Sequence, residues 1–124
     1  MRTLVGIMVA GAFGAAARYG VDGLVTQHVP GSFPWGTFVV NISASVLLGI
    51  VFTLTTQRLA VDAPTRLALT TGFIGSYSTF STLMLESMRL AGSGSNGLAL
   101  LNVLGSVFVG MIAVGVGMLL GRAF

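Results

Sequence analysis

The chain has 124 residues, of which 54% are hydrophobic and only 7% are charged. A typical soluble domain carries about 25% charged residues, so this chain lacks the polar side chains needed to cover a surface in contact with water. It contains no cysteine, which excludes disulfides, thiol catalysis and thiolate metal sites. Its net charge of +3 is too small and too dispersed to indicate nucleic acid binding. The composition predicts a protein embedded in a lipid bilayer.

Apolar residues gather in four stretches that use nearly the whole chain. The stretches span residues 4–27, 33–57, 67–90 and 97–121. Each reaches the roughly 20 residues that a helix needs to cross a bilayer, whereas transmembrane strands show alternating segments of about 10 residues. We therefore predict an all-α membrane protein, with one four-helix transmembrane domain over residues 1–124.

The arginines are distributed unevenly over the two ends of such a bundle. Four crossings place both chain termini on one side, together with the second connector. Four arginines fall on that side, namely Arg2, Arg58, Arg66 and Arg122. The other side has Arg89 and, as an open alternative, Arg18, so the bias is four against one or two. The positive-inside rule then predicts cytoplasmic termini. The bias is modest, so insertion in both orientations stays open.

Polar residues recur every four positions in the second and fourth stretches. Thr37, Asn41 and Ser45 share one face of the second helix, and Asn102 and Ser106 share one face of the fourth. One interpretation is hydrogen bonding between helices, worth about 0.6 kcal/mol per contact on average. The other is a polar lining for a shared ion path. Two matching stripes favour the path, and both interpretations stay open.

The third stretch places hydroxyl groups on all sides of a helix over two turns. Gly72 and Gly75 precede the run Ser-Tyr-Ser-Thr-Phe-Ser-Thr at residues 76–82. A continuous helix would present some of these hydroxyls to lipid, so we predict that the third helix is broken near residues 75–78. A break frees backbone carbonyls, which are hard oxygen ligands for a small cation. The ring edge of Phe80 carries partial positive charge and can touch an anion.

Arg18 and Glu86 are the ionisable residues nearest membrane depth, where charges mark candidate functional sites. In the alternative interpretation, Arg18 extends to a lipid headgroup and Glu86 pairs with Arg89 three positions along the helix. The sequence shows no convergent nucleophile and base, no metal-ligand spacing and no phosphate loop. We therefore predict that the chain is not an enzyme.

Three segments together strongly resemble the Fluc (CrcB) family of microbial fluoride channels. They are Gly-Ala-Ala-Ala-Arg-Tyr at residues 14–19, Trp-Gly-Thr-Phe-Val-Val-Asn at 35–41, and Thr-Gly-Phe-Ile-Gly-Ser-Tyr-Ser-Thr-Phe-Ser-Thr at 71–82. The resemblance implies a channel that lets fluoride out of the cell passively, across the microbial cell membrane. It also implies an antiparallel dual-topology dimer, with two fluoride pores and a structural sodium ion at the centre of the interface.

The resemblance assigns roles to individual residues. The backbone carbonyls of Gly75 and Ser78 match the family's sodium ligands. The residues we expect along the fluoride pore are Arg18, Asn41, Phe80, Thr82, Leu83, Glu86, Asn102 and Ser106. The role of Glu86 is the least defined of these.

The sequence departs from the family pattern at three positions. Leu83 stands where the family usually has a second pore phenylalanine, Ser76 where a glycine is usual and Ser78 where a threonine is usual. A serine offers the same backbone carbonyl as a threonine, so sodium binding should survive that change. Leucine has no positively polarised ring edge, so it lacks the fluoride contact that the resemblance implies for a phenylalanine here.

Two alternatives remain beside a homodimeric channel. Leu83 and the arginine bias both suit one subunit of a heterodimeric fluoride channel whose own pore is impaired. A small multidrug transporter has a similar size, but it needs an embedded carboxylate in its first helix. The first helix here has Arg18, and its only carboxylate is Asp22 near its end.

Overall fold

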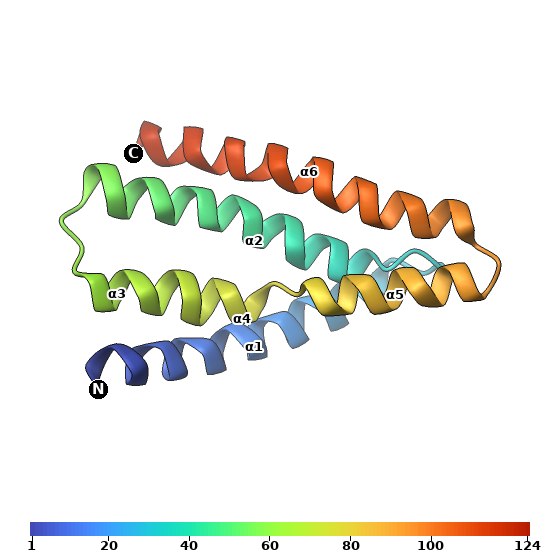
Figure 1. Cartoon of the computed structure of the whole chain (residues 1–124), viewed down its shortest axis with the longest axis horizontal. Helices are drawn as coiled ribbons and strands as arrows, with labels where there is room; N and C mark the ends of the chain where they lie inside the picture. Colours follow the sequence, from blue (N-terminus) through green and yellow to red (C-terminus); the bar gives the residue numbers. More distant parts are fainter.

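Three long apolar helices make up most of the chain. In the computed structural model, which describes all 124 residues, the protein is entirely helical (Figure 1). The long helices are α1 (Arg2–His28), α2 (Trp35–Thr53) with its π-helical continuation η1 (Leu54–Arg58), and α6 (Asn96–Ala123). Each is long and apolar enough to cross a membrane. They cover the first, second and fourth apolar stretches of the sequence.

The third apolar stretch is divided into shorter pieces. These are α3 (Ala63–Leu67), the π-helix η2 (Ala68–Ile74), α4 (Gly75–Tyr77) and α5 (Phe80–Gly92). The first three run on without a break. Ser78 and Thr79 then have extended backbone, with ψ angles of 159° and 112°, before α5 begins. No single piece is long enough to cross a membrane as one regular helix.

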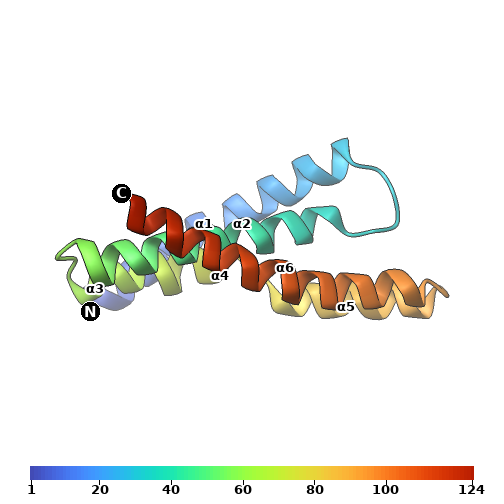
Figure 2. The same ribbon diagram turned by 90° about the horizontal axis from the view of Figure 1, so that it is seen from above.

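Both termini lie at the same end of the bundle, beside the connector between η1 and α3 (Figure 1). The other end carries the α1–α2 and α5–α6 connectors. Gly31 and Gly94 in these two connectors have φ angles of 136° and 85°, a region that favours glycine. At that end, the C-terminal half of α1 and the start of α2 diverge from α5 and the start of α6 (Figure 2).

Glycines allow the closest helix contacts. Gly49 on α2 and Gly117 on α6 face each other, and a Cβ atom on Gly117 would collide with the backbone carbonyl of Val46. Gly14 on α1 lies in the same way against the carbonyl of Phe73 on η2. Between lipid-facing helices, association depends on close packing and hydrogen bonds. These contacts fix α2 against α6 and α1 against η2.

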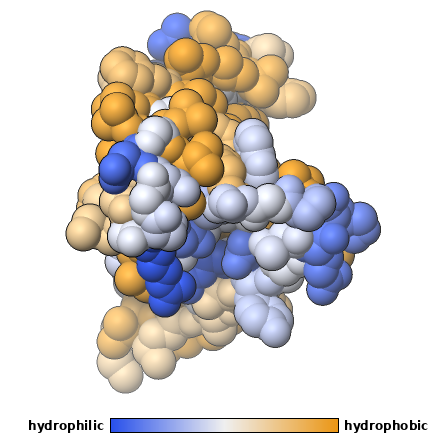
Figure 3. Space-filling view, turned by 90° about the vertical axis from the view of Figure 1, so that its right-hand side faces the viewer, coloured by the Kyte–Doolittle hydropathy of each residue, from blue (hydrophilic) through white to orange (hydrophobic).

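The buried core is small, and most large apolar side chains point outward. Val40, Ala44, Ile74 and Tyr77 form the only hydrophobic cluster of buried residues, where α2 meets η2 and α4. Exposed leucines, methionines and phenylalanines cover α1, α5 and α6. In the end view, hydrophilic residues gather across the middle, with hydrophobic residues above and below them (Figure 3). This distribution fits a bundle whose sides are covered by lipid or by another subunit.

We predict that Gly117→Ala destabilises the bundle, while Gly115→Ala does not. Both changes improve helix propensity by about 1 kcal/mol, but only Gly117 has backbone atoms in the way of a Cβ; nothing lies within 4 Å of one at Gly115. Overpacking of this kind costs about 1–3 kcal/mol. Thermal unfolding in detergent measures the difference, and equal midpoints for the two variants would show that α2 and α6 are not held by this contact.

Candidate functional site

The extended residues between α4 and α5 are held by a side chain of α2. The backbone N–H of Thr79 donates to Oδ1 of Asn41 at 2.8 Å, and Nδ2 of Asn41 donates to the carbonyl of Thr79 at 3.0 Å. The amide of Asn41 therefore replaces the backbone partners that Thr79 would have in a helix. This satisfies the exposed backbone groups inside an apolar bundle.

Two carbonyls before α5 lose their helical donors at this point. In a continuous helix, the N–H groups of Thr79 and Thr82 would donate to the carbonyls of Gly75 and Ser78. Here Thr79 donates to Asn41 instead, and Thr82 donates to Oγ1 of Thr79 at 3.3 Å as the cap of α5. The carbonyl oxygens of Gly75 and Ser78 are therefore free to accept from another group.

A cavity of about 250 Å³ lies beside these residues and collects several of the predicted pore residues. Its lining includes Asn41, Ser45, Ser78, Phe80, Leu83 and Ser106. Phe80 is 72% exposed, whereas Leu83 is buried. The hydroxyl of Ser106 is buried and has no hydrogen-bond partner within the chain. Polar groups of α2, of α6 and of the extended residues before α5 thus meet at one place.

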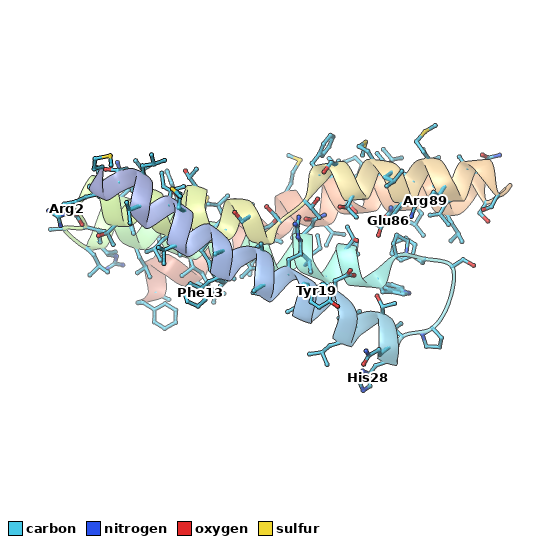
Figure 4. All side chains as sticks on the ribbon, turned by 90° about the horizontal axis from the view of Figure 1, so that it is seen from below. Arg2, Phe13, Tyr19, His28, Glu86 and Arg89 are labelled. Carbon is cyan, nitrogen blue, oxygen red and sulfur yellow. The ribbon has the colours of Figure 1, made fainter.

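A second cavity, of about 240 Å³, lies between α1, α2 and the start of α5. Arg18, Asp22, Thr37 and Thr82 line it, and Thr79 lines both this cavity and the first. Arg18 and Thr82 are thus separated from Phe80 by Thr79. Tyr19, which also lines the cavity, is labelled on α1 in Figure 4.

Glu86 takes its hydrogen bond from α2. The hydroxyl of Thr37 donates to Oε1 of Glu86 at 2.8 Å, and Oε2 is buried without a partner. Arg89 lies further along α5 (Figure 4), and Glu86 does not bond to it as the alternative interpretation proposed. A cavity of about 400 Å³ beside Glu86 opens toward the α1–α2 connector, and Asp22 lines it too.

The two polar residues of the fourth apolar stretch, Asn102 and Ser106, have different surroundings in the structure. Nδ2 of Asn102 donates to the hydroxyl of Ser87 at 3.0 Å, which links α6 to α5. Asn102 is fully buried, and its Oδ1 has no partner. Ser106 lines the cavity around Phe80, and Asn102 does not. The polar stripes therefore serve both interpretations: Thr37, Asn41 and Asn102 join helices, and Asn41, Ser45 and Ser106 line a cavity.

Two important residues were not singled out from the sequence. Thr79 is at the centre of the site, yet in the sequence it is one of several hydroxyls between residues 76 and 82. Ser87, the partner of Asn102, lies outside that run. Its position one turn after Leu83 is the only sequence feature that could have identified Ser87. In the structure both residues are buried, and the Ser87 hydroxyl donates to the Leu83 carbonyl.

The structure alone indicates the class of protein. It is a helical membrane protein whose polar groups gather around an interrupted helix, as in proteins that pass ions or small solutes. The family model "CrcB-like protein, Camphor Resistance (CrcB)" matches residues 5–118. The chain belongs to this family, which confirms the resemblance found in the sequence.

Curated relatives are named fluoride-specific ion channels. The chain is 41% identical over 116 residues to the fluoride-specific ion channel FluC of Magnetococcus marinus, covering 94% of each chain. It is 39% identical over 124 residues to FluC of Chloroflexus aurantiacus, covering 100% of this chain and 98% of that one. It is 42% identical over 116 residues to FluC of Solibacter usitatus, covering 94% and 95%.

Ion conduction is not an enzymatic function, so the prediction that the chain is not an enzyme agrees with these relatives. The multidrug-transporter alternative finds no support among them. The protein is a membrane protein of an ion-channel family.

We predict that Thr37→Val destabilises the protein and that Thr37→Ser does not. Valine keeps the shape of the side chain but leaves Oε1 of Glu86 without its donor, and Oε2 has no partner already. A polar group left unsatisfied in a buried site costs about 1–3 kcal/mol, and because Glu86 is only part-buried we expect the lower end of that range. Serine restores the hydroxyl, so thermal unfolding of both variants isolates the hydrogen bond. Equal loss in both would point to the methyl group of Thr37.

Proposed function

We propose that this chain is the subunit of a fluoride-selective channel that exports fluoride passively across the microbial cell membrane. Residues 1–124 form one transmembrane domain, in which α3 to α5 make the third of four crossings. The observation that carries the proposal is the cavity around Phe80, where neutral hydrogen-bond donors meet one exposed aromatic ring. Relatives of nearly the same length are named fluoride-specific ion channels.

Fluoride is small and strongly hydrated, so a pore must replace its water. The Ser106 hydroxyl and the second N–H of the Asn41 amide are neutral donors at the cavity, and the Ser106 hydroxyl has no other partner. Ser45 also lines the cavity, but its hydroxyl donates to the Asn41 carbonyl. Neutral donors attract the anion at short range without the tight hold of a lysine or arginine. Conduction requires this balance, because an ion must enter the site and also leave it.

Phe80 adds a contact of a different kind. Its ring is 72% exposed at the rim of the cavity, and the edge of an aromatic ring carries partial positive charge. Leu83, three residues later, lines the same cavity without such an edge. Thr82, Arg18 and Glu86 lie on the far side of Thr79, where they line the other two cavities. Asn102 supports this path through Ser87.

We propose that the functional unit is an antiparallel dual-topology dimer. Phe80 and Gly75 are exposed on one subunit although they belong to the site, which suits a face that a second subunit covers. Four arginines lie toward the end with the termini, which favours cytoplasmic termini by the positive-inside rule. The same bias, together with Leu83, supports the second candidate: a heterodimer with an oppositely oriented family member.

The residues present fit a structural sodium ion. The carbonyls of Gly75 and Ser78 have lost their helical donors to Asn41 and Thr79, and carbonyl oxygens are hard ligands suited to a small cation. We propose that these two carbonyls hold sodium where the two subunits meet. When bound, the ion supplies positive charge at the centre of a bundle that is otherwise neutral there.

We predict that the purified chain, alone in liposomes, passes fluoride and excludes chloride. Chloride is larger and gains less from closely spaced donors. Ion-selective electrodes measure both fluxes, and Phe80→Ile provides the control: it should assemble normally and lose fluoride flux. Comparable chloride flux, or full fluoride flux in Phe80→Ile, would contradict the proposed pore.

We predict that Leu83→Phe keeps or raises fluoride flux. An aromatic edge contact is worth about 0.5–1.5 kcal/mol by analogy with aromatic pairs, which is at most about one tenfold step in rate. The wild-type homodimer should therefore conduct without it. If the Leu83→Phe variant carries no fluoride flux, and flux appears only when a second family member is co-expressed, the heterodimer is the functional form.

A further inference from the structure

We propose that Asn41 is a positioning residue that holds the backbone extended at Thr79, so that the third crossing does not close into a continuous helix. Its amide withholds the Thr79 N–H from the Gly75 carbonyl, and so keeps that carbonyl available as a ligand. The role of the carbonyl as a sodium ligand rests on the proposed function. We call the two hydrogen bonds between the Asn41 amide and the Thr79 backbone the clamp. The clamp rests only on these contacts between α2 and Thr79.

The clamp has two hydrogen bonds that run in opposite directions. Oδ1 of Asn41 accepts from the Thr79 N–H at 2.8 Å, and Nδ2 donates to the Thr79 carbonyl at 3.0 Å. Asn41 is therefore fixed at both ends of its amide. Its helix is also held firmly, because Val40 and Ala44 on either side are 0% and 2% exposed.

The clamp also determines what the Thr79 side chain does. With its backbone extended, Thr79 places Oγ1 where it accepts from the Thr82 N–H at 3.3 Å and donates to Oγ1 of Thr82 at 3.0 Å. The Thr82 N–H is thereby withheld from the Ser78 carbonyl. One extended residue, held by Asn41, thus removes the helical donors of both proposed sodium ligands.

This role differs from a direct contact with fluoride. Asn41 has one acceptor oxygen and two N–H groups, and the clamp uses the oxygen and one N–H. Loss of flux in an Asn41 variant therefore has two possible origins: a lost fluoride donor, or a third crossing that has closed into a helix. Only the second changes the affinity for a cation at Gly75 and Ser78.

The first experiment measures how sodium stabilises the protein. Thermal unfolding midpoints are recorded in detergent while sodium chloride replaces N-methylglucamine chloride at constant ionic strength. Asn41→Leu should need at least about tenfold more sodium than wild type, the usual cost of losing a group that orients a metal ligand. Ser45→Ala is the matched control, because its hydroxyl bonds only to the Asn41 carbonyl of the same helix, and it should keep the wild-type sodium dependence.

A rescue separates the clamp from other effects of the leucine. In Asn41→Leu, replacing the residue 79 amide with an ester removes the N–H that would return to the Gly75 carbonyl. The ester also makes the Ser78 carbonyl, a proposed sodium ligand, a weaker acceptor, so the wild-type chain with the same ester is the reference. The sodium requirement of the Asn41→Leu ester should move toward that of this reference. Where sodium stabilises the wild-type chain, an unchanged sodium dependence in Asn41→Leu would overturn the proposal. So would a difference of about tenfold that persists between the two ester proteins.

A second measurement uses the wild-type chain and does not depend on sodium. A ¹³C=¹⁸O label at Gly75 reports by infrared whether that carbonyl accepts a helical hydrogen bond, and the same label at Gly105, inside α6, gives the bonded reference. In N-methylglucamine, the Gly75 band should lie at the higher frequency of a free carbonyl. A band at the Gly105 frequency overturns the clamp. A free carbonyl without any sodium effect supports the clamp and removes only the proposed sodium site, while fluoride flux tests the channel separately.

Discussion

A backbone surrounded by lipid can leave the helix only where other groups take over its hydrogen bonds. In this protein, that requirement is met at Thr79 by a single amide, that of Asn41. The free carbonyls, the direction of α5 and the cavity at Phe80 all follow from the interruption at this position. Without a partner there, the hydroxyl-rich run would gain more by continuing as a helix and bonding to itself.

Reaching Thr79 requires α2 to lie at a defined depth in the bundle, and the glycines provide this. Gly49 and Gly117 let α2 and α6 approach until backbone meets backbone, while Gly14 brings α1 against η2. In lipid there is little hydrophobic gain in bringing helices together, so close packing has to supply the stability. The glycines therefore support the site although they lie outside it.

Local patterns in the sequence were enough to find the long helices and to single out the hydroxyl-rich part of the third stretch. Apolar runs of helical length mark α1, α2 and α6, and hydroxyls on all sides of the third stretch mark residues 75–82. The pairing of side chains across helices was not accessible. Asn41 and Thr79 are 38 positions apart, and no spacing rule for one helix connects them.

The same limit explains the differences between the expected and observed contacts of Glu86 and Asn102. Arg89 is the nearest partner for Glu86 along the sequence, but Thr37, 49 positions away, bonds to it because α2 packs beside α5. Asn41 and Asn102 looked equivalent as members of two stripes. They differ because α2 and α6 place their asparagines at different points along the third crossing. Asn41 therefore bonds to Thr79, and Asn102 bonds to Ser87.

The arrangement of charge around Thr79 has a physical logic on the proposed function. Arg18, Asp22 and Glu86 line the cavities on one side of Thr79, and the larger of these two cavities is lined in part by the α1–α2 connector. The cavity on the other side of Thr79 is lined by neutral polar residues, Phe80 and two aliphatic side chains, with no charged group. Charged groups are tolerated where water can still solvate them. Beside a dehydrated anion, an arginine would bind it too tightly and a carboxylate would repel it. A hydrated ion thus meets charges first and loses its water only where neutral groups can release it again.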